Sequence, residues 1–182
     1  MKTMKPIFIH DQYTQFKAPN ADELISTLNE EVPNDDSEFH WGNTCQLERI
    51  KLDIDKYRPL ILPSVQKFAE DLKIDIDVDF DRPWLNIYRR RDFQEIHHHR
   101  PYDVVCVFFL EDQQKDFAKF YFFNKYQSEA DYSIWRINGN HFPKVEAGDI
   151  IMFPAHVLHG VTPHKSDIPR RTFAVNFSAR FI

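Results

Sequence analysis

The chain has 182 residues, of which 42% are hydrophobic and 15% aromatic, and its formal net charge is -5. This length suits one compact domain with a core of its own and is too short for two large domains. The acidic balance argues against a dedicated nucleic-acid binder, because such domains are usually basic. Cys45 and Cys106 are the only cysteines, so we expect free thiols in a reducing compartment rather than a disulfide framework.

Membrane and export signals are not visible in this sequence. No apolar run approaches the roughly 20 residues that a membrane-spanning helix needs. The opening segment, MKTMKPIFIHDQ, lacks the long apolar region of a signal peptide. We therefore expect a soluble, cytoplasmic protein without a membrane partner.

The first part of the chain predicts mixed structure. Residues 6–10 suggest a short strand, and residues 32–43 are polar and rich in turn formers, so they suggest an exposed loop. Asn20 followed by Glu23 resembles a capping box that opens a helix through about residue 31. A second helix is predicted over 56–72, where apolar residues recur at helical spacing. We expect residues 1–80 to form a support of helices and strand.

From Ile74 onward the hydrophobic period changes from helical to two. Strands are predicted at 74–80, 84–90, 102–110, 117–124, 132–138, 149–154, 157–161 and 172–182. Many short strands separated by Pro, Gly, Asn and Asp are typical of an all-β barrel or jelly roll. We therefore predict a single, mainly β domain over 1–182. Its barrel core lies in 81–182, and the helices of the first part cover one face of the sheet.

Three consecutive histidines, His97, His98 and His99, precede the strongest buried-strand pattern. Imidazole is the commonest side-chain metal ligand at neutral pH. In an extended chain, residues two apart share a face, so His97 and His99 can bind one ion while His98 points away. His159, in FPAHVLHGV, is the leading candidate for a third ligand. Three protein ligands leave coordination positions open, as a catalytic metal site requires.

Three segments together are similar to a known superfamily. They are QEIHHHRPYDVVCVFFL (94–110), GDIIMFPAHVLHGVTP (148–163) and RRTFAVNF (170–177). In order and spacing they resemble the Fe(II)/2-oxoglutarate-dependent dioxygenases, and within them a branch of small oxygenases found in phages and bacteria. The resemblance covers roughly residues 83–177. It implies a double-stranded β-helix, a jelly-roll barrel of cupin-like type.

The resemblance also implies cofactors and site residues. His97, His99 and His159 match the ligands of Fe(II), and Arg170 matches the arginine that binds the distal carboxylate of 2-oxoglutarate. A planar guanidinium suits that task because it grips a carboxylate through two hydrogen bonds. Thr172 shares a strand face with Arg170, whereas Arg171 faces the other way.

Asn86 and Tyr88 match an N-x-Y element that helps to hold the cosubstrate. The implied reaction converts 2-oxoglutarate and O2 into succinate and CO2 and hydroxylates a primary substrate. That substrate could be a peptide, a nucleic acid or a small molecule.

The middle ligand departs from the superfamily pattern. Most members carry a carboxylate where this chain has His99, as part of a two-histidine, one-carboxylate triad. Three neutral ligands leave the site one negative charge short. Asp103 could supply a carboxylate if the chain folds back after Pro101.

Two other functions fit parts of the pattern. A cupin-type metalloprotein or enzyme that does not use 2-oxoglutarate would share the histidines, but it would have no reason to place Arg170 on the following strand. An inactive binding protein could keep the same fold. Among the other polar residues, we expect His164 to be solvated. Arg89, Arg90 and Arg91, with Arg100, form either a charged turn or a surface for an acidic substrate.

Overall fold

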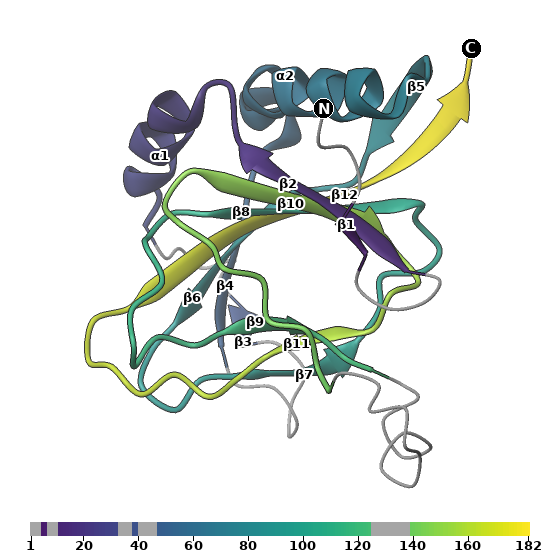
Figure 1. Ribbon diagram of the computed structural model, residues 1–182. Coiled ribbons are helices and arrows are strands. Elements are labelled where there is room, and N and C mark those ends of the chain that lie inside the picture. The colour runs from purple at the N-terminus through teal and green to yellow at the C-terminus, as the bar shows by residue number, and fades with distance from the viewer. Residues whose placement is uncertain (1–4, 7–10, 33–37, 40–46, 125–138) are drawn as a thin grey trace, which may run out of the picture.

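The structure is a computed structural model that describes residues 5–6, 11–32, 38–39, 47–124 and 139–182 (Figure 1). Its two helices are α1 (Ala21–Asn29) and α2 (Ile54–Leu72). Its strands are β1 (Lys5–Pro6), β2 (Gln12–Lys17), β3 (Glu38–Phe39), β4 (Glu48–Lys51), β5 (Ile76–Phe80), β6 (Trp84–Tyr88), β7 (Gln94–His97), β8 (Val104–Phe109), β9 (Phe120–Phe122), β10 (Asp149–Pro154), β11 (His159–Val161) and β12 (Arg170–Phe181). The strand predicted at 132–138, most of the one at 6–10, most of the loop at 32–43, and Cys45 lie outside the described residues.

Two antiparallel sheets form the body of the described chain. The large sheet has the order β1-β2-β10-β8-β12-β6-β4-β3, and β5 pairs with the far half of β12. The small sheet has the order β7-β11-β9. Figure 1 shows α1 and α2 over one face of the large sheet and the small sheet on the opposite side. This is the mainly β double-stranded β-helix with supporting helices that the sequence predicts.

Alternation along β12 separates the core from the interior of the barrel. Phe173, Val175 and Phe177 are fully buried and pack in the core beneath the helices. Arg170 and Thr172 lie on the other face and line a cavity between the two sheets. A strand places successive side chains on opposite faces. One strand therefore serves the core and the cavity at once.

The helices close the outer face of the large sheet. Asp53 caps the start of α2, because its carboxylate accepts a hydrogen bond from the Asp55 amide at 3.0 Å. The α2 helix covers the region predicted as the second helix. The capping box predicted for α1 is wrong. The Asn20 side chain makes no cap and donates to the Leu60 carbonyl at 2.9 Å, which ties α1 to α2. Neither described helix is long and apolar enough to cross a membrane.

Four strands were not expected from the sequence, namely β2, β3, β4 and β7, and β3 lies within the segment predicted as an exposed loop. They are short and rich in polar residues, so their hydrophobic pattern is weak. The β2 strand pairs with β10, and β4 pairs with β6. Pairing with a neighbouring strand therefore specifies them more than local sequence does. Through β2 and β4, the first 80 residues extend the large sheet on both sides.

Replacing Phe173 by Ala should cost about 3–5 kcal/mol of unfolding free energy, because a fully buried aromatic ring leaves a cavity. The Phe173 ring also contacts Tyr57 of α2, with ring centroids 5.4 Å apart. Phe181→Ala on the same strand is the control, since Phe181 is 80% exposed and should cost less than about 0.5 kcal/mol. Urea unfolding measures both values. Equal losses would contradict the division of β12 described above.

Candidate metal centre

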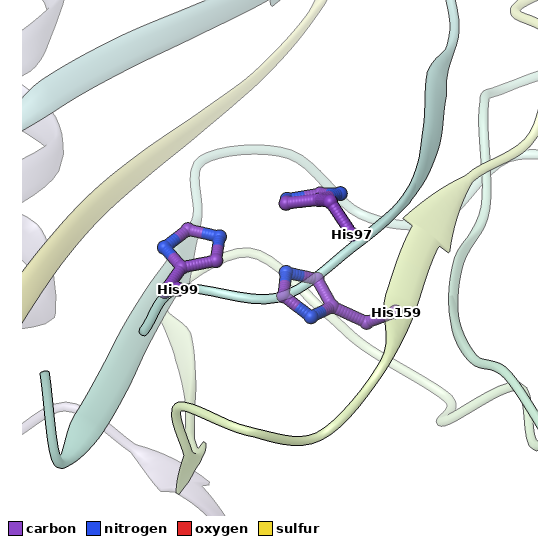
Figure 2. A group of neighbouring side chains, drawn as sticks. All are labelled: His97, His99 and His159. Atoms are coloured by element: carbon purple, nitrogen blue, oxygen red, sulfur yellow. The ribbon is translucent and has the colours of Figure 1, made fainter. Parts of the chain in front are cut away.

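Three imidazoles from two neighbouring strands and the loop after one of them converge on a single point (Figure 2). His97 ends β7, His99 follows two residues later, and His159 begins β11 directly opposite His97 in the strand register. Their ring centroids are 4.2 to 4.9 Å apart. One nitrogen of each ring lies within 4.8 Å of the other two, a spacing that one metal ion can bridge.

The hydrogen bonds of the three rings fix which nitrogen is available. Each Nδ1 lies 2.7 to 3.0 Å from an oxygen that can only accept, so each Nδ1 carries the proton. The acceptors are the main-chain oxygens of Glu95 and Val157 and the side-chain oxygen of Asn176. Every Nε2 therefore keeps its lone pair. This second layer of hydrogen bonds is the arrangement that orients metal-ligating histidines.

Burial keeps the three imidazoles neutral. Desolvation, followed by the neighbouring His99, lowers the pKa of His97 to about 3, and desolvation lowers the pKa of His99 to about 4. Burial, followed by its two histidine neighbours, holds the pKa of His159 well below its usual value. The Nε2 of His99 is buried and has no hydrogen-bond partner in the described part of the chain. Three neutral nitrogens suit a first-row transition metal.

Gln94 contacts the candidate centre, and sequence reasoning did not single it out. Its side-chain amide donates to Nε2 of His97 at 3.2 Å, while its Oε1 accepts from the Tyr88 hydroxyl at 3.0 Å. Gln94 thus occupies the lone pair through which His97 would bind a metal, and its amide would have to release that nitrogen. The signal was present in the sequence, because Gln94 opens the QEIHHH run that carries the resemblance.

Gly160, next to His159, allows the small sheet to close. A Cβ at this position would lie 3.1 Å from the main-chain oxygen of Gln94 and 2.8 Å from the Tyr121 hydroxyl. The first contact involves backbone of β7, which cannot move without shifting His97. Glycine therefore permits the close approach of β7 and β11 that brings His97 and His159 together.

Arg170 lies in the same cavity as the histidines. It is only 2% exposed, and its two terminal nitrogens have no hydrogen-bond partner among the described residues. The guanidinium carbon lies 5.6 Å from the ring centre of Tyr88 and 5.3 Å from that of Phe109. Burial lowers the pKa of Arg170, but a guanidinium stays charged at neutral pH. A buried cation whose donors lack acceptors is costly, and an anionic ligand would offset that cost.

The neighbours of Arg170 follow the predicted pattern of faces. Across the paired strands β6 and β12, Tyr88 is opposite Arg170, and Asn86 is opposite Thr172. The Asn86 amide donates to the Thr172 hydroxyl at 3.4 Å, and all four side chains line the cavity. Arg171 points to the other face, where its Nε and main-chain amide both donate to Glu111 at 2.7 Å.

Residues 82–176 match the family described as "Putative 2OG-Fe(II) oxygenase". The chain belongs to this oxygenase family. Membership implies Fe(II) as cofactor and 2-oxoglutarate and O2 as cosubstrates of the oxygenase. No functionally curated protein matches the chain.

Solved structures support the fold of the oxygenase. A prolyl-4-hydroxylase of Pseudomonas putida has a TM-score of 0.67 and 17% identity, over 92% of this chain and 92% of its own. The alpha ketoglutarate dependent epimerase SnoN of nogalamycin biosynthesis has a TM-score of 0.69 and 13% identity, over 94% of this chain and 81% of its own. HygX of Streptomyces hygroscopicus, solved with nickel and 2-oxoglutarate bound, has a TM-score of 0.59 and 10% identity, over 91% of this chain and 82% of its own. At these identities the likeness concerns the fold alone.

The residues of the oxygenase fit both groups that the family implies. Three unprotonated imidazole nitrogens lie close together, as a metal requires, and that of His97 accepts from the Gln94 amide. The two terminal nitrogens of Arg170 lack an acceptor in the described residues, as a carboxylate-binding arginine does before its ligand is bound. The cavity that joins them contains every residue predicted for the metal and the cosubstrate.

Other candidates from the sequence lie away from this centre. Asp103 is exposed, and its carboxylate accepts a hydrogen bond from the Ala179 amide at 2.9 Å, so the structure brings His99 rather than Asp103 to the other histidines. His98, which lies between His97 and His99 in the sequence, is exposed. The expectation that His164 is solvated is wrong. It is buried, and its ring accepts a hydrogen bond from the Ala118 amide and donates one to the Ile168 carbonyl. His164 therefore links two loops.

The three consecutive arginines, Arg89, Arg90 and Arg91, fit a charged turn better than a free basic surface. Arg89 pairs with Glu48 at 2.8 Å, and Arg90 pairs with Asp167 at 3.0 Å. These ion pairs neutralise two of the three consecutive cations.

Acidification should destabilise the metal-free protein through these histidines. Because His97 and His99 have pKa values of about 3 and about 4 when folded, against 6.5 for an ordinary histidine, the unfolded chain binds more protons below pH 6.5. The stability that these two neutral histidines support is fully present above pH 6.5. It is lost as the pH falls from 6.5 toward 4. The loss approaches about 1.4 kcal/mol per pH unit for each proton.

Urea unfolding of the metal-free protein between roughly pH 5 and pH 7 tests this dependence. The double variant His97→Asn/His99→Asn should show a much flatter curve. His98→Asn is the matched control and should keep the wild-type slope. A wild-type slope in the double variant would mean that the two imidazoles are not held neutral.

Proposed function

We propose that this oxygenase holds Fe(II) through Nε2 of His97, His99 and His159, binds 2-oxoglutarate at Arg170, and hydroxylates a primary substrate. One observation carries the proposal. A fully buried guanidinium without an acceptor in the described residues shares a cavity with three histidines whose Nε2 lone pairs converge. Neither feature improves folding by itself, and both are explained by ligands.

Arg170 is proposed to bind the distal carboxylate of 2-oxoglutarate. Its two terminal nitrogens can donate to the two carboxylate oxygens in parallel, and burial of the guanidinium strengthens that pairing. Phe109 and Tyr88 pack against the guanidinium and limit its rotation. The side chain is therefore oriented before its ligand arrives, which reduces the entropic cost of binding.

Thr172, Asn86 and Tyr88 are proposed to complete the cosubstrate site. Thr172 lies two residues from Arg170 on the same face, so its hydroxyl can donate to the same carboxylate. Asn86 steadies that hydroxyl, and its own oxygen accepts from Nε of Arg49 at 3.2 Å. The Tyr88 hydroxyl donates to Gln94, which in turn contacts His97. Tyr88 thus links the cosubstrate side of the cavity to a metal ligand.

Charge balance explains why three neutral ligands are workable here. When bound, Fe(II) would supply the O2 chemistry that couples decarboxylation of 2-oxoglutarate to succinate and CO2 with oxidation of a C–H bond. The protein contributes three uncharged imidazoles and the positive charge of Arg170. The dianionic cosubstrate is then the main counter-charge in the cavity, so metal and cosubstrate affinity should be strongly coupled.

The alternatives are less consistent with the cavity. A metalloprotein that does not use 2-oxoglutarate would leave the Arg170 guanidinium buried without a role. A binding protein without turnover would keep the same ligands, so activity assays must separate it. The structurally similar prolyl-4-hydroxylase and epimerase carry out different reactions on one fold, so fold alone does not assign the substrate.

The division of the chain is also proposed. All residues of the proposed metal and cosubstrate sites fall within 81–182, which we propose as the catalytic core of a single domain. Residues 1–80 would support it through the helices and the added strands. The cytoplasmic location stays a prediction of the sequence.

Replacing His97, His99 or His159 singly by Ala should abolish stoichiometric Fe(II) binding and 2-oxoglutarate-dependent succinate formation, because two remaining imidazoles cannot hold the metal as three do. Metal content after anaerobic loading and succinate release measure the two effects. His98→Ala is the matched control and should keep both, since its side chain points to solvent. Full turnover in His159→Ala would refute the proposed ligand set.

Replacing Arg170 by Met should weaken 2-oxoglutarate binding by at least about 30-fold, the loss expected for one partner of a buried charge pair. The free energy of unfolding of the ligand-free protein should rise, because the variant removes a desolvated and unpartnered charge. Calorimetric titration with the Fe(II)-loaded protein and urea unfolding measure these effects. Arg171→Met should leave cosubstrate affinity within about twofold and lose stability with its Glu111 pair. The reverse pattern would place the cosubstrate at Arg171.

A further inference from the structure

A second cavity, here called the outer groove, borders the metal centre, and Arg170 does not line it. Its volume is about 300 Å³. It shares Trp84, His97 and His99 with the inner cavity. The histidine cluster therefore forms part of the wall between the proposed cosubstrate site and an open groove. Side chains special to the groove are Arg49, Lys51, Asp81, Arg82, His98 and Asn176.

The polar wall of the outer groove consists mainly of hydrogen-bond donors. Arg49, Lys51 and Arg82 carry three positive charges and can only donate through their side chains. Asn176 uses its oxygen to accept from His99, so its remaining polar atom is the donating amide nitrogen. Among the described residues, Asp81 is the one carboxylate that lines the groove, and it already accepts from the Tyr102 hydroxyl. A ligand of this groove must therefore supply acceptors.

Trp84 gives independent evidence for a ligand. It is 8% exposed, and its indole Nε1 is buried with no hydrogen-bond partner in the described residues. Its ring stacks on His99, with centroids 5.8 Å apart and planes 20° apart, and the Arg49 guanidinium lies 4.9 Å from its centre. The indole is therefore fixed in position beside a metal ligand, with its only donor unused. Buried donors of this kind normally have a partner.

We propose that the outer groove binds the primary substrate through an oxyanion, a carboxylate or a phosphate group, held by Arg82 and the Trp84 indole with Lys51 beside them. An oxyanion accepts several hydrogen bonds and carries the charge that this wall favours. Since the groove meets the metal centre at His97 and His99, a C–H bond close to the oxyanion would lie near that centre. The proposal rests on the proposed function, because it assigns the substrate side of the same centre.

Paramagnetic relaxation can test this groove without an identified substrate. The full chain is loaded anaerobically with Mn(II) and saturating 2-oxoglutarate, so that Arg170 is occupied. Inorganic phosphate is then titrated and followed by ³¹P relaxation, and acetate is titrated separately and followed by its methyl protons. We expect a saturable relaxation enhancement for one of the two probes, and the responding probe identifies the oxyanion. Protein loaded with Zn(II) should give none.

Two variants locate the binding. Arg82→Gln removes one positive charge and should weaken the responding probe by about fivefold, as expected for one exposed ion pair. Trp84→Phe keeps an aromatic ring against His99 but removes the N–H, and should weaken it by about threefold to tenfold. Arg180→Gln, an exposed cation outside the groove, is the control and should bind like the wild type. The 2-oxoglutarate affinity of Arg82→Gln should stay unchanged, which shows that the fold is intact.

The outcomes separate the two proposals. Failure to bind Mn(II) or 2-oxoglutarate would refute the proposed function and this inference together. Normal loading without enhancement for either probe would refute the oxyanion groove alone. Enhancement that is unchanged in both Arg82→Gln and Trp84→Phe would also refute it, because the probe would then bind the metal directly or lie elsewhere.

Discussion

The alternation of side chains in the large sheet is the constraint on which the rest of the structure depends. In β12 and β6, one face supplies the aromatic and aliphatic core beneath the helices, and the other face supplies the polar lining of the cavity. A polar face of this kind cannot be buried against helices without a high desolvation cost. The helices must therefore cover only the apolar face, and the small sheet must cover the other. Closing the small sheet over that polar face brings His97 and His159 opposite Arg170 and Thr172.

The cavity between the sheets combines features that oppose folding. The terminal nitrogens of Arg170 are buried without a hydrogen-bond acceptor in the described residues, and three desolvated imidazoles lie close together. Each is costly for the empty chain, so the apolar core around Phe173 and Phe177 must compensate. Strained or unsatisfied groups that persist in this way are characteristic of functional sites. Ligands that satisfy them would stabilise the folded state in proportion to their affinity.

Much of the site could be predicted from the sequence, because strand periodicity determines which residues share a face. The strand at 149–154 and the convergence of His97, His99 and His159 in one cavity follow from spacing and from the resemblance. The strands β2, β3, β4 and β7 could not be predicted, since their pattern becomes clear only when a neighbouring strand pairs with them. His164 was misjudged for a related reason, because its two hydrogen bonds come from segments distant in space from its own polar loop. The roles of Gln94 and Trp84 likewise depend on contacts between elements.

The central claim is that three neutral histidines and one buried arginine hold Fe(II) and 2-oxoglutarate in the cavity between the sheets. A crystal structure of the full chain, grown anaerobically with Fe(II) and 2-oxoglutarate, tests it most directly. The account predicts a metal bonded to Nε2 of His97, His99 and His159, with the distal carboxylate of 2-oxoglutarate on Arg170. A metal bound without His99, or a cosubstrate carboxylate away from Arg170, would contradict it.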